Sequence, residues 1–223
     1  MANESWRTAI TRRDKRTRDR ALTAPTRTLI ESEYMGTMHW GPPPTNQHSG
    51  GLILSVLDFG AGKSFDADLI GEMHPGIETT AYDPNAPHLS ETIATDVVPS
   101  REHYDLVLVN FVLNVQQTRA EAMEVLKAAM SHVRYAGYIW VATRSRATIE
   151  KEAQKRGWGA PNPDGAYRSR TIKSTGGSTW QLGLDSADIE AMVAQSGQGF
   201  SLVNTQNDIS LGKDCGWALA IKL

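Results

Sequence analysis

The sequence predicts an α/β sandwich built on a mostly parallel sheet, and three observations support this fold class. From residue 52 onward, short apolar runs alternate with segments of helical periodicity, as in parallel strands joined by crossover helices. A glycine-containing turn follows the first run, and two apolar runs close the chain without a helix between them. With 223 residues, 40% of them hydrophobic, the chain is long enough for one domain with its own core.

The first half of the sheet is predicted from two apolar runs and the helix between them. Leu52–Leu57 is typical of a buried parallel strand, because it is apolar throughout and ends at a turn. Ser64–Met73 carries apolar residues on one helical face, and Glu78–Tyr82 reads as the next strand. The pattern then weakens, with a short strand expected near Ile93–Thr95.

The second half begins with the strongest strand signal in the chain, Asp105–Val115. Thr118 and Glu121 have the spacing of a capping box, which predicts that a helix starts there. The remaining elements are expected to be a strand over Tyr138–Thr143, a helix over Ser186–Gln195, and strands over Phe200–Thr205 and Trp217–Leu223.

We expect two parts along the chain. Residues 1–50 form a basic N-terminal helical segment, with helices over Thr8–Leu29, followed by a proline-rich linker or lid. Residues 51–223 form the main domain, and residues 144–185 are an insertion after its fifth strand.

Composition excludes several classes of protein. No run approaches the ~18 apolar residues of a membrane span, and no apolar signal segment opens the chain, so we expect a cytoplasmic protein with no membrane partner. The lone Cys215 excludes an internal disulfide, and the six histidines show no metal-ligand spacing, so no metal site is expected. The sequence does not indicate the oligomeric state.

Positive charge gathers in two segments, residues 1–30 and 144–173, each with eight Arg or Lys residues against three acidic ones. The net charge of the whole chain is −2, so these segments contrast with an acidic body. They indicate a possible nucleic-acid partner. Solvent-exposed basic segments without a partner are an equally good interpretation.

The turn after the first strand has the sequence Asp58-Phe-Gly60-Ala-Gly62. At the first crossover of an open sheet, such a turn lets the backbone approach a nucleotide-like ligand. Phe65 stands where a dinucleotide fingerprint has its third glycine, so a pyrophosphate is disfavoured. Asp58, together with Asp83 after the second strand, suits a cationic ligand that carries a ribose. The alternative is a tight turn in which Asp58 caps the helix.

Three segments carry a resemblance to a known family. Val56–Gly62, Ala81–Pro84 and Tyr104–Asn110 resemble motif I, the acidic post-I site and motif IV of class I S-adenosylmethionine-dependent methyltransferases. The resemblance covers roughly residues 51–223. It implies a Rossmann-like three-layer sandwich with a seven-stranded sheet whose last strand is antiparallel, and S-adenosylmethionine as the cofactor.

The resemblance also implies roles for individual residues. Gly60 and Gly62 would approach the methionine portion, Asp83 the ribose and Asp96 the adenine amino group, so a bulky residue at Gly60 is expected to block binding without affecting the fold. The full set of expected cofactor-binding residues is Asp58, Gly60, Ala61, Gly62, Asp83, Pro84, Asp96, Asn110 and Phe111.

A narrower resemblance adds the N-terminal segment. Arg7–Arg12, Tyr82–Pro84 and Asn110–Val115 together are similar to a group of bacterial and phage methyltransferase-domain proteins, some associated with DNA modification. This resemblance implies that the N-terminal segment folds back over the cofactor.

The expected reaction is methyl transfer to a nucleic acid or nucleotide-like acceptor, with Asn110 and Asn114 as the candidate catalytic residues. Enzymes that methylate DNA amino groups usually carry two prolines after the fourth strand, and their absence after Asn110 disfavours that reaction. The position of Cys215 on the expected last strand disfavours a covalent mechanism of the cytosine-C5 type.

Other interpretations remain open. Trp158, Tyr167 and Trp180 lie in or beside the second basic segment, where they would either stack on a base or cover the sheet edge. The acceptor would then be a nucleic acid or a small molecule. A cofactor-binding regulatory module without turnover is a further alternative, and a nucleotide-dependent oxidoreductase is disfavoured by Phe65.

Overall fold

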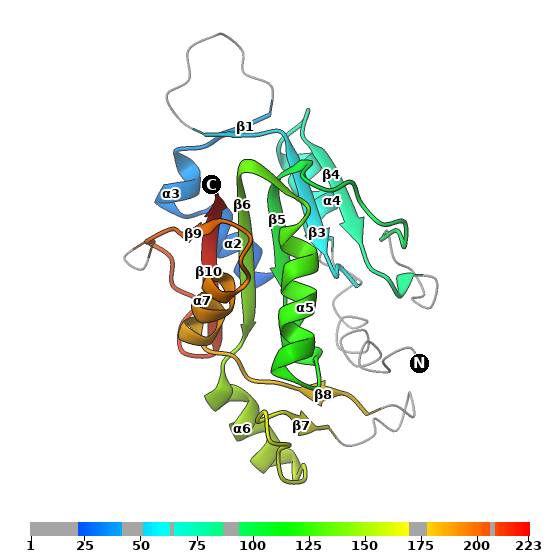
Figure 1. Cartoon of the computed structure of the whole chain (residues 1–223). Helices are drawn as coiled ribbons and strands as arrows, with labels where there is room; N and C mark the ends of the chain where they lie inside the picture. The colour runs from blue at the N-terminus through cyan, green and yellow to red at the C-terminus, as the bar shows by residue number, and fades with distance from the viewer. Residues whose placement is uncertain (1–21, 42–50, 63–64, 87–93, 170–177, 206–207) are drawn as a thin grey trace.

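The computed structural model describes residues 22–41, 51–62, 65–86, 94–169, 178–205 and 208–223, and it shows a three-layer α/β arrangement (Figure 1). The central sheet has the strand order β4-β3-β5-β6-β10-β9. β10 is antiparallel to both of its neighbours and the other pairs are parallel, so the predicted sheet type is confirmed. These strands are β3 (Ser55–Phe59), β4 (Glu78–Tyr82), β5 (Tyr104–Asn110), β6 (Val133–Arg144), β9 (Phe200–Leu202) and β10 (Cys215–Lys222).

The described part of the sheet has six strands, where seven were expected. A single parallel bridge between Tyr82 and Thr95 stands at the outer side of β4, where the seventh strand would lie. The short strand was expected near Ile93–Thr95, and of these residues Ile93 lies outside the described residues.

Helices cover both faces of the sheet, and the sheet residues alternate between two cores. On β6, Ile139 and Val141 belong to the core under α5 (Arg119–Met130) and α7 (Ser186–Gln195). Trp140 and Ala142 belong to the opposite core, under α2 (Ala24–Ile30), α3 (Glu33–Gly36) and α4 (Asp66–Met73). This alternation follows from the two-residue period of a strand that is buried on both faces.

Two helices of the second half begin at side-chain caps. The Thr118 hydroxyl accepts from the N–H of Glu121 at the start of α5, which confirms the predicted helix start. The helix α6 (Arg146–Arg156) begins after Ser145, whose hydroxyl accepts from the N–H of Thr148, and ends at Gly157 in the left-handed conformation. α6 therefore occupies part of the basic segment for which no regular element was predicted, and Ile149 and Ala153 are its buried residues.

Several predicted boundaries were wrong. The run Leu52–Leu57 divides into β2 (Leu52–Ile53), which pairs with β1 (His39–Trp40), and β3. The predicted strand Asp105–Val115 ends at Asn110 and is followed by the 3-10 helix η3 (Leu113–Val115). Its break falls at Phe111, whose φ of 61° is incompatible with an extended strand.

The residues before position 42 contribute to the core of the main domain. Leu29 and Met35 are fully buried in the same cluster as Val56 and Leu106 of the central sheet. The side chain of Asp208 accepts from the N–H groups of Glu33 and Tyr34, which attaches α3 to the C-terminal part of the chain. The division of the chain at residue 50 stays a prediction, and the segment Arg7–Arg12 lies outside the described residues.

Candidate active site

The carboxyl ends of β4, β3 and β5 meet at one edge of the sheet, and most of the predicted site residues gather there. Gly60, Ala61 and Gly62 follow β3, Asp83 and Pro84 follow β4, and Asn110 and Phe111 follow β5. In open α/β sheets this edge is where ligands bind. The edge therefore brings together residues from positions more than 50 apart in the chain.

The glycine loop is fixed by its own backbone N–H groups. The N–H groups of Gly60 and Ala61 both donate to the carbonyl oxygen of Tyr82, at 2.8 and 2.9 Å. The N–H of Gly62 donates to Oδ2 of Asp83 at 3.0 Å. All three N–H groups of the loop are therefore used within the chain, so they are not available to bind a phosphate as they would in a pyrophosphate-binding loop.

The two glycines have different reasons to lack a side chain. Both have positive φ, 76° at Gly60 and 57° at Gly62. A Cβ on Gly60 would lie 2.6 Å from Cγ2 of Val112, whereas a Cβ on Gly62 would find only Oδ2 of Asp83, at 3.9 Å. Gly60 is thus required by packing between the β3 and β5 loops, while a Cβ on Gly62 would meet no atom of the described residues closer than 3.9 Å.

Carboxylates surround this loop. Asp83 is only 8% exposed. Its Oδ1 accepts from the N–H of Asn85 at 2.8 Å, and its Oδ2 accepts from the N–H of Gly62. Asp96 is exposed and follows the bridge at Thr95. Burial raises the pKa of Tyr82, and the negative charges of Asp83 and Asp96 raise it further. An edge that disfavours another negative charge in this way suits a cationic ligand.

Two other predicted cofactor residues are placed differently. Asp58 is 2% exposed and lies within β3, before the glycine loop. Pro84 is exposed in the turn that follows β4. Direct contact of these two residues with a ligand stays a prediction.

The end of β5 is a strained turn. Phe111 has a φ of 61°, and its N–H donates to the carbonyl oxygen of Ala142 on β6 at 2.7 Å. Such conformations in residues other than glycine are costly and tend to occur at functional sites. The turn ends β5 immediately after Asn110.

Asn110 belongs to a side-chain network that sequence reasoning missed. Its Nδ2 donates to Oγ1 of Thr26 at 2.7 Å and lies 3.4 Å from Oδ2 of Asp66. Asp66, at the start of α4 and 1% exposed, also accepts from the hydroxyls of Thr23 and Thr26 and from the N–H of Thr23. These partners are 40 or more positions apart in sequence, and no local pattern links them.

The second candidate catalytic residue, Asn114, lies on η3 and is 3% exposed. Its carbonyl oxygen accepts from the N–H of Leu182, which attaches η3 to the segment after β8 (Trp180–Gln181). Within the part of the chain that the structure describes, its buried Oδ1 has no hydrogen-bond partner. Asn114 is thus connected to the insertion, whereas Asn110 is connected to the N-terminal segment through Thr26.

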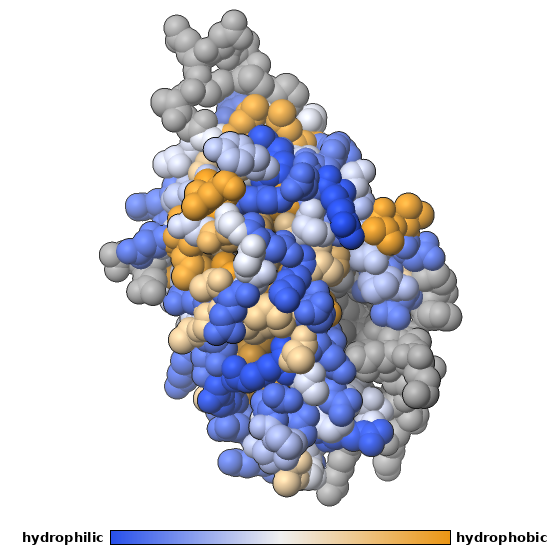
Figure 2. All heavy atoms as spheres, in the orientation of Figure 1, coloured by the Kyte–Doolittle hydropathy of each residue, from blue (hydrophilic) through white to orange (hydrophobic). Residues whose placement is uncertain are grey.

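The insertion lies against this end of the sheet, and much of its positive charge is paired. Asn162 donates to the carbonyl oxygen of Gln117, and the strands β7 (Tyr167–Arg168) and β8 form a small antiparallel pair. Arg144 and Arg156 both pair with Glu152, and Arg146 pairs with Asp188. Hydrophilic side chains dominate the lower end of the face in Figure 2, where α6 and β7 lie in Figure 1.

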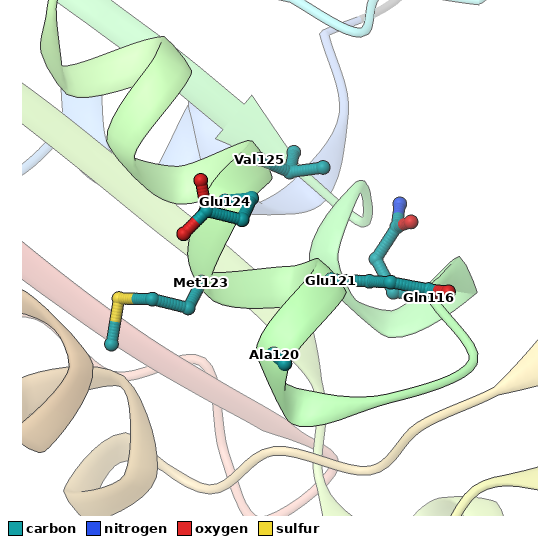
Figure 3. Close-up of a pocket in the computed structure, with 6 residues that line it drawn as sticks. All are labelled: Gln116, Ala120, Glu121, Met123, Glu124 and Val125. Atoms are coloured by element: carbon teal, nitrogen blue, oxygen red, sulfur yellow. The ribbon is translucent and has the colours of Figure 1, made fainter.

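A hollow of about 640 Å³ lies along α5, but its side chains do not form a site. Figure 3 shows that they fan out around the helix and do not converge on one point. Glu121 accepts from the N–H of Gln117, and Glu124 pairs with Lys127, so both acids serve the helix itself. The hollow is lined by Gln116, Ala120, Glu121, Met123, Glu124 and Val125.

Two further features were searched for in the described ranges. No group of three or more His, Cys, Asp or Glu side chains among them could hold a metal ion. No helix built from these residues is both long and apolar enough to cross a membrane.

Comparison with known proteins gives similarity in structure and not in sequence. Neither protein-family models nor curated protein sequences match the chain. An S-adenosylmethionine-dependent methyltransferase from Clostridium acetobutylicum superposes with a TM-score of 0.55 at 10% identity, over 97% of this chain and 98% of that one. The fold is that of the S-adenosylmethionine-dependent methyltransferases.

Two more structures are similar to this methyltransferase-type fold. The 1,6-didemethyltoxoflavin-N1-methyltransferase of Burkholderia thailandensis, solved with its substrate and S-adenosylhomocysteine, has a TM-score of 0.53 at 16% identity, covering 100% of this chain and 91% of that one. A protein from Pyrococcus horikoshii has a TM-score of 0.54 at 13% identity, covering 76% and 82%. At these identities the likeness establishes the fold, and the resemblance of the motifs stays a prediction.

Proposed function

We propose that the protein is an S-adenosylmethionine-dependent methyltransferase whose acceptor is a nucleic acid or a nucleotide-like molecule. The observation that carries this proposal is the glycine loop: its three N–H groups are all bonded to the end of β4. A loop without free N–H donors is unsuited to a pyrophosphate, which disfavours a nicotinamide or flavin dinucleotide at this edge.

The residues at the edge fit S-adenosylmethionine. The molecule carries positive charge on its sulfonium and amino groups, and Asp83 and Asp96 provide negative charge beside the loop. A Cβ on Gly62 would meet no atom of the described residues closer than 3.9 Å, and a glycine there would let the ligand approach the backbone closely. When bound, this cofactor would supply an electrophilic methyl group.

The chain's own contribution to transfer would be to hold the acceptor in line and to exclude water, since methyl transfer depends strongly on positioning. Support for Asn110 in this role comes from its buried Oδ1, which has no hydrogen-bond partner in the described part of the chain. An amide oxygen accepts a hydrogen bond but does not take up a proton at neutral pH. An acceptor that offers an N–H to Oδ1, and a nitrogen lone pair to the methyl group, would fit this side chain.

The insertion supports a heteroaromatic acceptor. Tyr167 and Trp180 lie on the β7–β8 pair, which contacts η3 close to Asn114. Arg168 in the same pair is exposed. Trp180 is the register partner of Arg168 and only part of it is buried against the core, so its ring beside the exposed guanidinium can stack a base, with or without an attached nucleic-acid strand.

A small-molecule acceptor is the second candidate. The Burkholderia neighbour is named for methylating N1 of 1,6-didemethyltoxoflavin, which is a small molecule. The extensive ion pairing of Arg144, Arg146 and Arg156 leaves the insertion with less free positive charge than its sequence indicates, which also favours a small acceptor.

Transfer of tritium from methyl-labelled S-adenosylmethionine tests the proposal. The panel contains the ribonucleosides, the deoxyribonucleosides, total tRNA and single-stranded DNA. We expect labelled product with at least one nucleotide-like compound, and loss of the label with Asn110→Ala. Binding of the cofactor without labelled product from any compound would contradict the proposed acceptor class and favour a small molecule or a regulatory module without turnover.

A further inference from the structure

We infer that Asp66 is a positioning residue that acts through Thr26 to fix the side-chain amide of Asn110, so that the Asn110 oxygen faces the methyl acceptor. This inference rests on the proposed function. It assigns a role to Asp66, Thr23 and Thr26, which belong to neither motif I nor motif IV.

The hydrogen-bond directions in this cluster follow from what each group can donate. The Thr26 hydroxyl has one hydrogen, which it donates to Oδ2 of Asp66 at 2.7 Å. Its oxygen is then left as an acceptor, and it accepts from Nδ2 of Asn110 at 2.7 Å. A rotated amide would place the Asn110 oxygen against two acceptors, the Thr26 oxygen and the Asp66 carboxylate.

The network therefore sets which end of the amide faces the site. With Nδ2 held by Thr26 and Asp66, Oδ1 of Asn110 is directed away from them, and it is buried without a hydrogen-bond partner in the described ranges. A buried acceptor left unsatisfied costs about 1–3 kcal/mol, which a bound N–H donor would offset. The orientation prepares Asn110 for a ligand that donates.

Asp66 is itself held by the segment before the main sheet. Oδ1 accepts from the backbone N–H of Thr23 at 2.8 Å, and Oδ2 accepts from the Thr23 hydroxyl at 2.5 Å. Thr23 is the N-cap residue of α2 and Thr26 lies in its first turn, and Leu29 of the same helix is fully buried in the core. The orientation of Asn110 thus depends on residues 22–41, which makes this segment part of the acceptor side of the site.

The test uses three variants and one matched control in the full chain. Thr26→Val keeps the shape and removes the hydroxyl, Thr26→Ser restores a hydroxyl, and Asp66→Asn removes the carboxylate. Asp105→Asn is the control, because Asp105 is also 2% exposed and accepts from the backbone N–H groups of Leu54 and Ser55 at the amino end of the same sheet. It destabilises the protein without touching Asn110.

The first readout is the side-chain amide signal of Asn110 in a ¹⁵N-correlated spectrum, assigned by its absence in Asn110→Ala. We expect this signal to move in Thr26→Val and Asp66→Asn, to return close to its original position in Thr26→Ser, and to stay in place in Asp105→Asn. An unmoved signal in Thr26→Val would overturn the inference, and this readout does not require a known acceptor.

The second readout separates binding from turnover, with the best acceptor of the panel as the probe. In Thr26→Val we expect kcat to fall about tenfold, as for one lost hydrogen bond of ~1.4 kcal/mol, while affinity for S-adenosylhomocysteine changes less than about twofold. Thr26→Ser should restore kcat. Equal losses in Asp105→Asn and Thr26→Val would show a merely structural role. Absence of S-adenosylhomocysteine binding by the unaltered chain would instead contradict the proposed function.

Discussion

The two halves of the candidate site are built in different ways. Around the glycine loop, contacts are made by backbone N–H groups and one carboxylate, all within the short segments that follow β3 and β4. Around Asn110, contacts are made by side chains from α2, α4 and β5, with up to 84 positions between partners. The first half is a local structure that a short motif can specify. The second exists only after the N-terminal segment has packed onto the sheet.

The largest effect, on the free energy of unfolding, is expected from disturbing the packing of the glycine loop. Gly60→Ala should lower the free energy of unfolding by about 2–4 kcal/mol, because the new Cβ would meet Val112 at 2.6 Å in addition to the cost of positive φ. Gly62→Ala is the matched control, with the same sign of φ but no close contact, and should cost about 1 kcal/mol. Urea denaturation measures both, and equal costs would contradict the packing argument.

This comparison corrects one expectation from the sequence. A bulky residue at Gly60 was expected to block the ligand without affecting the fold, but the contact with Val112 means that Gly60→Val disturbs the fold itself. Gly62, where a Cβ would meet no atom of the described residues closer than 3.9 Å, is the better position for testing close approach of a ligand.

The second largest effect is expected from removing the carboxylate of Asp83, which lies beside the glycine loop. Asp83→Ala should weaken binding of S-adenosylhomocysteine by about 1–3 kcal/mol, because it removes the proposed ribose acceptor and releases the N–H of Gly62. Asp185→Ala is the control, since that residue also accepts from a backbone N–H, at Arg146, but lies at the start of α7. Calorimetric titration compares the two, and equal affinities would remove Asp83 from the site.

A smaller effect, on binding of a nucleic-acid acceptor, is expected from the basic residues of the insertion. Reversing the charge of Arg168, Arg170 and Lys173 should flatten the salt dependence of any binding to single-stranded DNA, since each lost phosphate contact lowers the slope by about one. Arg170 and Lys173 lie outside the described residues. Fluorescence anisotropy at several salt concentrations gives the slope. A slope equal to that of the unaltered chain would make this segment a solvent-exposed loop without a nucleic-acid partner.

The smallest effect concerns Asp188 on α7, which pairs with Arg119 of α5 and Arg146 of α6 away from both halves of the site. Burial favours a higher pKa for Asp188, but the N–H of Asp185 and the positive charges of Arg119 and Arg146 outweigh it and hold the pKa below the usual value of 3.8. A lowered pKa gives stability that is present at pH values above the unfolded pKa and is lost as pH falls through the folded one. Urea midpoints between pH 6 and pH 3 should therefore fall less in Asp188→Asn than in the unaltered chain; parallel curves would contradict this.

The same comparison explains how far the sequence could predict the structure. The sheet type, most helices and the glycine loop were predicted because each is specified by local periodicity, capping or a short motif. The end of β5 was missed because Asn110–Val115 is apolar enough to continue a strand, and only the positive φ of Phe111 ends it. Asp66 was missed because an acid at the start of a helix is ordinary, and its partners Thr23 and Thr26 are placed by tertiary packing.

The central claim is that the edge formed by the glycine loop and Asp83 binds S-adenosylmethionine. Titration calorimetry of the unaltered chain with S-adenosylhomocysteine, and separately with NAD⁺, tests it most directly. The account predicts one S-adenosylhomocysteine per chain with micromolar affinity, about −8 kcal/mol, and no heat of binding with NAD⁺. Binding of NAD⁺, or of neither compound, would contradict it.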